Sequence, residues 1–451
     1  MDKSYKKVLV LSHNAFSKTQ NNGKTLESFF QNWDKDKIAQ IYLQPETPDF
    51  DFCKNYYRMT DYEVLNNILF KGRIGKKIIL SKEDNLETLN PVIQRLYTGR
   101  NNGNERKGIN NFIHKAFIAR KPLFIFMREW FWKLGKWKNK ELENYIEDFS
   151  PDVLFFQGSS CVFGYEICLW IREKFQIPVI LELTDDYTTG LYKWSVIEKV
   201  NKKRYLDIFS YTINLASKVY TISEYMKDEY KSRFGGDYSV LMNSIPQRNV
   251  KDEQEGGNLL YTGNVSLKRW ELLVDIGRSL EDLNIKYSAE YKLFIYTPTP
   301  VSPEIRKIFE SISAIKYGGS LLKEELERAV SNSNILVHVE AFDEKNKAIT
   351  RLSISTKIPE YMASRRTIFA VGPDDIASIK YIKENNFGKV VTTRSSAAIK
   401  QGIEELLSNK NKRRFYSDTA FQGYLNMHTP KRNQENIYIT IEEACGRERH
   451  E

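Results

Sequence analysis

The chain of 451 residues has 41% hydrophobic residues and a formal net charge of +10. This length exceeds what one hydrophobic core usually supports, so we expect two or three domains, and the hydrophobic content excludes a disordered protein. Four cysteines and five histidines have no metal-ligand spacing, so we expect reduced thiols, no metal site and no cofactor. No apolar run is long enough for a signal peptide or a membrane span.

The first expected strand, "KKVLVLSH", is followed by "SKTQNNGKTLESFF" at 17–30. The Gly-Lys-Thr at 23–25 is typical of the end of a phosphate-binding P-loop. However, Lys18 stands where the first glycine of that motif belongs, and no later strand ends in a convincing Mg²⁺-binding aspartate. We therefore predict a polar loop, residues 13–25, at the carboxyl end of a parallel strand, where α/β proteins receive ligands, followed by a helix. The alternative is an ordinary strand-to-helix turn.

The basic segment 106–140 contains ten Lys or Arg residues and one acidic residue, Glu129. Pro122 suits the first position of a helix. Apolar residues with helical spacing follow it: Leu123, Met127, Trp130, Leu134 and Trp137. A basic amphipathic helix with tryptophans is typical of a segment that lies on an anionic membrane surface, and the alternative is a core helix of a basic protein. No recognition motif accompanies the charge, so we expect no nucleic-acid binding.

Short apolar runs alternate with helical patterns along the rest of the chain, which predicts parallel sheets with helices on both faces. The first series of strands is "KKVLVLSH", "DKIAQIYL", "PDVLFFQG", "IPVILELTD" and "SKVYTIS". The second is "NLLYTGN", "YKLFIYT", "AIKYGG", "NILVHVE", "TIFAVGP" and "GKVVTT". We predict an α/β protein with two Rossmann-like, doubly wound domains at 1–247 and 258–425, a polar linker at 248–257, and a tail at 426–451 that packs back on the first domain.

Two such domains facing one another would leave a cleft at the carboxyl ends of their strands, where open α/β sheets bind nucleotide-type ligands. "LELTDDYTT" places Asp185 and Asp186 at one of these strand ends. An ionised carboxylate there could orient or deprotonate a hydroxyl group. The alternative is that the pair caps a helix or stabilises a loop.

The segment "LLYTGNVSLKRWELLVDI" at 259–276 resembles the opening of the donor domain in GT-B glycosyltransferases, especially the large retaining family 4. The resemblance implies that Gly263 lies at the diphosphate of a nucleotide sugar and that Arg269 binds it. Arginine suits this role because it makes bidentate, charge-assisted hydrogen bonds to phosphate. Asn264, which we include in the expected donor site, stands where many relatives have an arginine. The alternative is that Arg269 is a surface cation.

The segment "SISTKIPEYMASRRTIFAVGPDD" at 353–375 resembles the part of family 4 that holds the nucleotide sugar. The resemblance implies that Ser355, Thr356 and Lys357 contact the diphosphate at the start of a helix. It also implies that Glu360 accepts hydrogen bonds from the ribose hydroxyls. The alternative is an ordinary loop and helix cap.

One departure from the family pattern concerns the transferred sugar. Family 4 usually carries two glutamates separated by seven residues, and Leu352 stands at the first of these positions. Glu340, at the end of the preceding strand, is a possible substitute. The contact to the sugar and the stereochemistry of transfer therefore stay open.

The first domain resembles family 4 more loosely, in "SKVYTISEYMKDEY" at 217–230 and "SVLMNSIP" at 239–246. The loop after the first strand then corresponds to the loop that lies over the donor phosphates and faces the acceptor. Its candidate residues are His13, Asn22 and Gly23. In this scheme Asp185 or Asp186 meets the acceptor hydroxyl.

The resemblance implies a metal-independent glycosyltransferase that moves a sugar from a nucleoside diphosphate sugar, UDP- rather than GDP-linked, to a lipid-linked or polymeric acceptor. We expect it to act in cell-surface polysaccharide synthesis, in the cytoplasm at the inner face of the plasma membrane. Two alternatives are a sugar-nucleotide 2-epimerase of the same fold and a non-catalytic, membrane-associated binding module.

Overall fold

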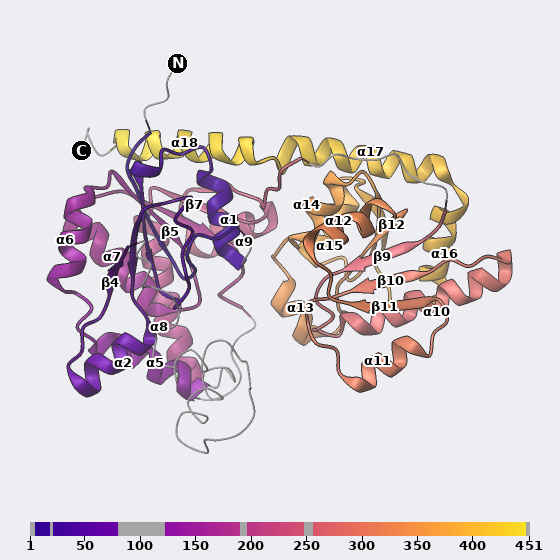
Figure 1. The fold of residues 1–451 in the computed structure, drawn as a ribbon, viewed down its shortest axis with the longest axis horizontal. Coiled ribbons are helices and arrows are strands. Elements are labelled where there is room, and N and C mark those ends of the chain that lie inside the picture. Colours follow the sequence, from indigo (N-terminus) through magenta and orange to yellow (C-terminus); the bar gives the residue numbers. More distant parts are fainter. Residues whose placement is uncertain (1–4, 19–20, 80–121, 190–195, 248–255, 448–451) are drawn as a thin grey trace. The chain divides into compact units, whose positions relative to one another are not determined.

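The computed structural model describes residues 5–18, 21–79, 122–189, 196–247 and 256–447. The chain forms two compact units. The first comprises Met1–Thr221, Lys227–Ser239 and Gln434–Glu451, and the second comprises Ile222–Met226 and Val240–Asn433. Both are α/β units built on a sheet of mainly parallel strands, as the sequence predicts (Figure 1).

The sheet of the first unit has the strand order β4-β3-β2-β1-β5-β6-β7-β8. Its strands are β1 (Val8–Ser12), β2 (Ile38–Tyr42), β3 (Asn55–Arg58), β4 (Lys76–Ile78), β5 (Val153–Gln157), β6 (Val179–Leu183), β7 (Lys218–Thr221) and β8 (Tyr238–Val240). The strands β1, β2, β5, β6 and β7 confirm the five expected ones. The strands β3, β8 and the antiparallel β4 are not among the five expected ones, because short strands at or near a sheet edge lack a long apolar run.

Helices and one short 3-10 helix, Lys35–Lys37, connect these strands. The helices are α1 (Asn21–Phe30), α2 (Asp61–Phe70), α5 (Pro122–Leu134), α6 (Lys140–Phe149), α7 (Val162–Phe175), α8 (Val196–Leu215) and α9 (Glu224–Phe234). The last helix, α18 (Pro430–Arg447), lies along the first unit (yellow in Figure 1). Tyr220 on β7 bonds to Thr440 at 2.6 Å, and the Tyr438 ring packs against Trp33. These contacts explain why residues after Gln434 belong to the first unit.

The second unit has six strands, all paired in parallel, in the order β11-β10-β9-β12-β13-β14. They are β9 (Leu259–Thr262), β10 (Leu293–Tyr296), β11 (Ile315–Gly319), β12 (Ile335–Val339), β13 (Thr367–Val371) and β14 (Gly388–Val391). All six match expected strands. Alternate residues point to opposite faces of a strand, so each face of the sheet has its own hydrophobic core.

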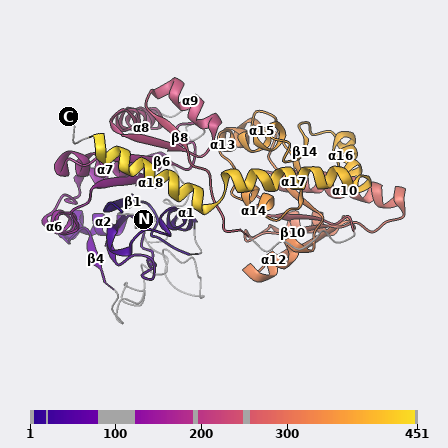
Figure 2. The same cartoon turned by 90° about the horizontal axis from the view of Figure 1, so that it is seen from above.

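One core lies under α10 (Arg269–Tyr287), α11 (Pro303–Glu310) and α16 (Ser396–Ser408). The other lies under α12 (Lys323–Ser331), α14 (Lys357–Ala363), α15 (Ala377–Glu384) and α17 (Lys410–Met427). The short helix α13 (Glu344–Thr350) follows β12. Helix α17 packs against α14, as Figure 2 shows.

Both sheets reverse their strand order at a central pair of strands. In the first unit β1 lies between β2 and β5, and in the second β9 lies between β10 and β12. The connections from two such neighbouring strands leave in opposite directions, which opens a crevice at their carboxyl ends. Each unit therefore has one preferred position for a ligand.

The first sheet also buries a carboxyl group. Glu182 on β6 is 1% exposed, and its burial raises the pKa of the carboxyl to about 7, although the Gln157 amide on the neighbouring strand opposes this. An acid whose pKa is higher in the folded than in the unfolded chain stabilises the fold below the unfolded pKa. That contribution is lost as pH rises through the folded pKa.

We expect Glu182→Gln to leave stability nearly unchanged near pH 5 and to raise it increasingly up to pH 8, because the neutral amide never ionises. The gain should approach about 3 kcal/mol at most for a shift of this size. Calorimetry of both proteins across this pH range measures it, with Glu173→Gln, at an exposed position of α7, as the matched control. A pH-independent difference between Glu182→Gln and the parent would contradict the prediction.

Candidate functional site

The crevice of the second unit lies at the ends of β9 and β12, and an ion pair joins its two sides. Arg269, the first residue of α10, donates from Nη2 to both carboxylate oxygens of Glu340, at 2.9 and 3.1 Å. Glu340 follows β12 and is buried. Both are expected site residues, and the structure brings them into direct contact.

The charge state of Glu340 follows from its neighbours. Burial alone would raise the pKa of its carboxyl, but His338, whose Nε2 lies 3.3 Å from Oε1, and Arg269 outweigh burial and hold the pKa below its usual value. Glu340 is therefore an ionised group whose two oxygens orient Arg269. A carboxylate held in this way is suited to positioning the guanidinium.

The loop after β9 carries Gly263 and Asn264. The Asn264 side chain accepts a hydrogen bond from the backbone N–H of Ser266 at 2.6 Å, so it organises its own loop. The Asn264 carbonyl accepts from the Tyr261 hydroxyl at 2.7 Å. Both contacts shape the backbone next to Gly263 at the end of β9.

The segment before α14 lies at the same edge of the sheet. Lys357 and Glu360 form an ion pair of 2.9 Å within the first turn of α14. Ser355 donates its backbone N–H to Ser378 at 3.0 Å, and its hydroxyl accepts from the Lys357 N–H at 3.4 Å. Thr356 is the N-cap residue and makes no side-chain cap bond. These contacts stabilise the start of α14, and the Lys357–Glu360 ion pair lies in its first turn.

Tyr361, which the sequence does not indicate as a site residue, connects α14 to β9. Its buried hydroxyl accepts a hydrogen bond from the backbone N–H of Thr262 at 3.1 Å. Leu352, which the resemblance to family 4 aligns with a glutamate, is also buried, and its carbonyl accepts from the Ser223 hydroxyl at 2.8 Å.

The crevice of the first unit contains a cavity of about 330 Å³. His13 and Asn14 follow β1, Asn22 lies in α1, and residues 157–160 lie at the end of β5 and just after it. Helices α5 and α8 complete the wall, the latter with Arg204, which has no ion-pair partner among the described residues. The volume falls in the range of small-ligand pockets.

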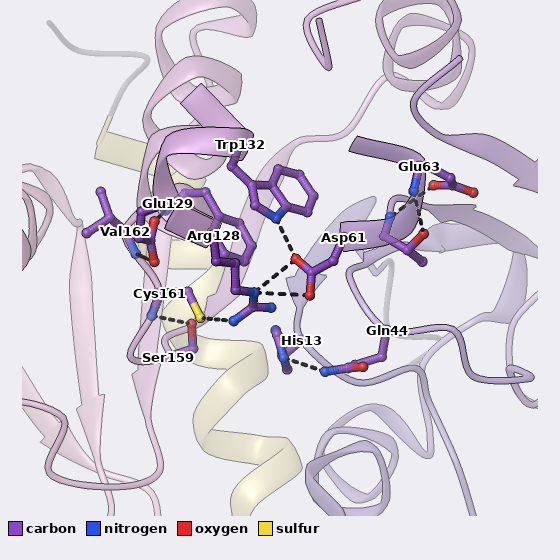
Figure 3. A network of polar contacts seen from close by, with 12 residues as sticks. His13, Gln44, Asp61, Glu63, Arg128, Glu129, Trp132, Ser159, Cys161 and Val162 are labelled. Carbon is purple, nitrogen blue, oxygen red and sulfur yellow. Dashed lines mark hydrogen bonds and ion pairs between the residues drawn. The ribbon is translucent and has the colours of Figure 1, made fainter. Parts of the chain in front are cut away.

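Arg128 on α5 lines this cavity, and Figure 3 shows the side chains that hold it. Arg128 donates from Nε to both oxygens of Asp61, at 2.9 and 3.0 Å, and from Nη1 to the sulfur of Cys161 at 3.1 Å. The indole N–H of Trp132 donates to Asp61 at 2.7 Å. Because Asp61 starts α2, this network fixes α5 against α2.

His13 lines the cavity and has one buried polar atom without a partner among the described residues. Its Nε2 lies 2.6 Å from the amide nitrogen of Gln44, which can only donate, so Nε2 accepts and the proton resides on Nδ1. Burial lowers the pKa of His13 to about 4, and the positive charge of Arg128 adds to this effect, whereas the negative charge of Asp61 opposes it. The imidazole ring is therefore neutral at pH 7. The buried Nδ1 has no hydrogen-bond partner among the described residues.

Gln157, at the end of β5, is a second unused group. It lies beside Glu182, and neither of its buried amide atoms makes a hydrogen bond of normal geometry within the described chain. Buried polar groups are almost always paired, so His13 and Gln157 together indicate a position that a polar ligand can fill.

Glu129, the lone acidic residue of the basic segment, has a local role. Its two carboxylate oxygens accept the backbone N–H groups of Val162 and Phe163, both at 3.1 Å, at the start of α7. Burial raises the pKa of this carboxyl to about 7, although Arg128 and the two N–H groups lower it. Glu129 therefore caps α7 from a neighbouring helix.

The structure corrects the predicted loop 13–25. Helix α1 begins at Asn21, so "NNGKT" forms its first turn and is not a loop. A Cβ atom at Gly23 would overlap the carbonyl oxygen of Ala15, so only glycine allows this turn to pack on the preceding backbone. Asn22 lines the cavity, whereas Gly23 is not among its lining residues.

The two aspartates after β6 make local contacts. The Asp186 carboxylate accepts from the backbone N–H and hydroxyl of Thr188, at 2.9 and 2.7 Å, from the Tyr230 hydroxyl at 2.6 Å, and from Thr189. Burial opposes ionisation, but these bonds together hold the pKa of Asp186 below its usual value. Asp185 accepts the N–H of Asp186 at 3.1 Å. Neither is among the described residues that line the cavity, and these contacts fit the loop-stabilising alternative.

The part of the basic segment at 106–121 lies outside the described residues. In α5 the expected apolar stripe is exposed at four of its five positions: Leu123, Met127, Trp130 and Leu134. The core-helix alternative is therefore wrong for these four residues. The buried side of α5 contains Glu129 and Trp132 instead, and Trp137 is buried beyond the helix end.

Within the described ranges, no group of three or more His, Cys, Asp or Glu side chains could hold a metal ion. The same ranges contain no helix with the length and hydrophobicity needed to cross a bilayer.

Comparison with known proteins supports the architecture. No protein-family model and no curated protein matches the sequence. Among solved structures, HepE from Anabaena, determined in complex with UDP, superposes with a TM-score of 0.57 at 10% identity over 97% of this chain and 100% of its own. The chain has the fold of the GT-B glycosyltransferases.

Two further structures of this fold cover the same extent. Sucrose-phosphate synthase from Thermosynechococcus elongatus has a TM-score of 0.58 at 10% identity over 97% of this chain and 98% of its own. A glycosyltransferase from Rickettsia africae has a TM-score of 0.56 at 13% identity over 98% and 99% of the two chains. Both units of the chain therefore take part in the similarity.

The Arg128–Asp61 pair generates a stability prediction. We expect Asp61→Asn to destabilise the first unit by about 3 kcal/mol, because it leaves the charge of the poorly exposed Arg128 uncompensated. Denaturant unfolding measures the change. Glu141→Gln breaks the exposed Arg73–Glu141 pair and should cost less than about 1 kcal/mol. Equal losses of unfolding free energy in both variants would contradict the prediction that the Arg128–Asp61 pair matters more than an exposed ion pair.

Proposed function

We propose that this protein is a glycosyltransferase that uses a UDP-sugar as donor and transfers the sugar to a hydroxyl group. The GT-B fold, shared with the UDP-bound HepE, supports this. The observation that carries the proposal is Arg269, held by the buried Glu340 at the β9–β12 crevice. An oriented guanidinium at this position is suited to a diphosphate.

In the proposed reaction, Arg269 and Lys357 stabilise the negative charge that develops on the leaving diphosphate, which positioned cations do most effectively in a partly buried site. Glu360 holds the ribose. We propose that these cations make the reaction independent of a metal ion and that the sugar keeps its anomeric configuration. Glu340, as a possible substitute for the missing glutamate, acts in this scheme through Arg269.

The acceptor would bind in the cavity of the first unit. The amide and hydroxyl groups there can bond to sugar hydroxyls, and the Nδ1–H of His13 supplies a donor. We propose Asp185 or Asp186 as the group that contacts the acceptor hydroxyl. Both carboxylates also accept local hydrogen bonds.

We further propose a lipid-linked or polymeric glycan as acceptor, in cell-surface polysaccharide synthesis at the cytoplasmic face of the membrane, with segment 106–140 on the lipid surface. One observation favours a non-catalytic binding module instead: Leu352 fills the position of the first family glutamate with a core side chain. Such a module should not turn over a UDP-sugar.

The first experiment is thermal unfolding of the purified protein with UDP, GDP, ADP and ATP, each with Mg²⁺ and with EDTA. UDP at about 100 times its dissociation constant should add roughly 2.7 kcal/mol to the unit that binds it, a shift of several degrees. We expect this shift to persist in EDTA. Stabilisation by ATP alone, and only with Mg²⁺, would overturn the proposal.

Changing Arg269 to Ala should lower the rate of sugar transfer or of donor hydrolysis by about 10² or more, as losing an oriented charge partner of the transition state does. Radiolabelled UDP-sugars measure this rate. The matched control is Arg278→Ala, at an exposed position of the same helix. Full activity of the Arg269 variant would remove this residue from the site.

A further inference from the structure

The cavity of the first unit contains a charged side chain that the fold leaves without a partner. Arg204 on α8 lines the cavity and is half-buried. Its guanidinium makes no ion pair, hydrogen bond or cation–π contact within the described part of the chain. Charged side chains that are withdrawn from water are usually paired, because an uncompensated charge loses hydration without a replacement. An unpaired guanidinium on a cavity wall therefore indicates a position for an anionic group.

A second guanidinium lines the same cavity. Arg128 donates from Nε to Asp61 and from Nη1 to Cys161, whereas its Nη2 has no hydrogen-bond partner among the described residues. Asp61 holds this side chain in place but is not one of the residues that line the cavity. The Nη2 donor is thus oriented before a ligand binds, and guanidinium N–H groups match the oxygens of phosphate and carboxylate.

The carboxylates of the cavity wall are already engaged. The oxygens of Glu129 accept the backbone N–H groups of Val162 and Phe163 at the start of α7. Glu198 is buried and also has an interaction partner. Among the described residues that line the cavity, Arg204 is therefore the one charged side chain without a partner. This arrangement fits one anionic group on a small ligand and not a polyanion, which would need a broad basic surface.

The uncharged groups of the wall suit the rest of a sugar. The side chains of Asn22 and Ser160 line the cavity and make no hydrogen bond within the described ranges. The amide of Gln157 and the Nδ1 of His13 are buried without partners there as well. Amide and hydroxyl groups both donate and accept, as sugar hydroxyls do. The cavity thus combines one position for an anion with several for hydroxyl groups.

We propose that the acceptor is an anionic sugar and that Arg204, together with Nη2 of Arg128, binds its phosphate or carboxylate group. This deepens the proposed function, which leaves the charge of the acceptor open, and rests on it for the role of the sugar as acceptor. The anionic group takes no part in the bond changes. A hydroxyl of the same sugar forms the new glycosidic bond and releases its proton to solvent, while UDP leaves with the electron pair of the broken bond.

The test measures binding of small sugars to the full chain by NMR titration without UDP. The probes are glucose, galactose and mannose, the 6-phosphate of each and the uronate of each. We expect at least one anionic form to bind about tenfold or more tightly than its neutral parent, which is the size of one hydrogen-bonded contact to a charged group. The phosphates and the uronates distinguish the two kinds of anion. If no anionic form binds better than its parent, the proposal is overturned.

Arg204→Gln should abolish the preference for the anionic sugar, and Arg204→Lys should restore part of it because the charge returns without the planar donor pair. Thermal unfolding without ligand should be nearly unchanged in both variants, since Arg204 has no ion pair to lose within the described chain. The matched control is Lys203→Gln, which removes one positive charge at an exposed position of α8 outside the cavity. An unchanged anion preference in Arg204→Gln would contradict the proposal.

Stabilisation by UDP, measured on the same proteins, reports on the donor site separately. UDP stabilisation without any anion preference would overturn this inference and leave the proposed function intact. An anion preference without UDP stabilisation would support an anion site in the cavity but contradict the role of the bound sugar as acceptor.

Discussion

The reversal of strand order at the centre of each sheet is the constraint on which both candidate sites depend. Parallel strands present their carboxyl ends at one edge, and connections that leave β1 and β5, or β9 and β12, in opposite directions cannot cover the point between them. Polar residues that follow β1 and β5 therefore border one crevice in the first unit, and those that follow β9 and β12 border another in the second. His13, Gln157, Arg269 and Glu340 all lie at or beside such a strand end.

Each crevice contains an arginine held by a carboxylate from another element. Arg128 and Asp61 join α5 to α2, and Arg269 and Glu340 join α10 to the end of β12. A buried ion pair is a poor source of net stability, because desolvation offsets much of the attraction. Its effect here is geometric: the guanidinium is kept in one orientation before any ligand arrives, which lowers the cost of ordering the site on binding.

Hydrogen bonding separates the polar residues that hold the structure from those available to a ligand. The Asp186 carboxylate has four donors and Glu129 has two backbone N–H groups, so both are engaged in shaping the chain. The Nδ1 of His13 and the Gln157 amide are buried without such bonds. The sequence indicates both Asp186 and His13 as candidate site residues, and only their hydrogen-bond partners distinguish them.

The sequence by itself determined the two α/β units and eleven of their strands, because periodicity of apolar residues is a local property that survives in any context. It also identified Arg269, Glu340 and the segment 355–360 as notable. It could not pair Arg269 with Glu340 or Arg128 with Asp61, since these partners lie 71 and 67 residues apart and meet only through the packing of several elements.

The same limit applies to the apolar stripe of α5. Helical spacing predicts that such residues share one face, but the neighbours of the helix decide whether that face is buried, and here they bury Trp132 and Glu129 and leave Trp130 and Leu134 exposed. Likewise, the close approach of Ala15 to Gly23, which makes "NNGKT" a helical turn, is a tertiary contact that no local pattern contains.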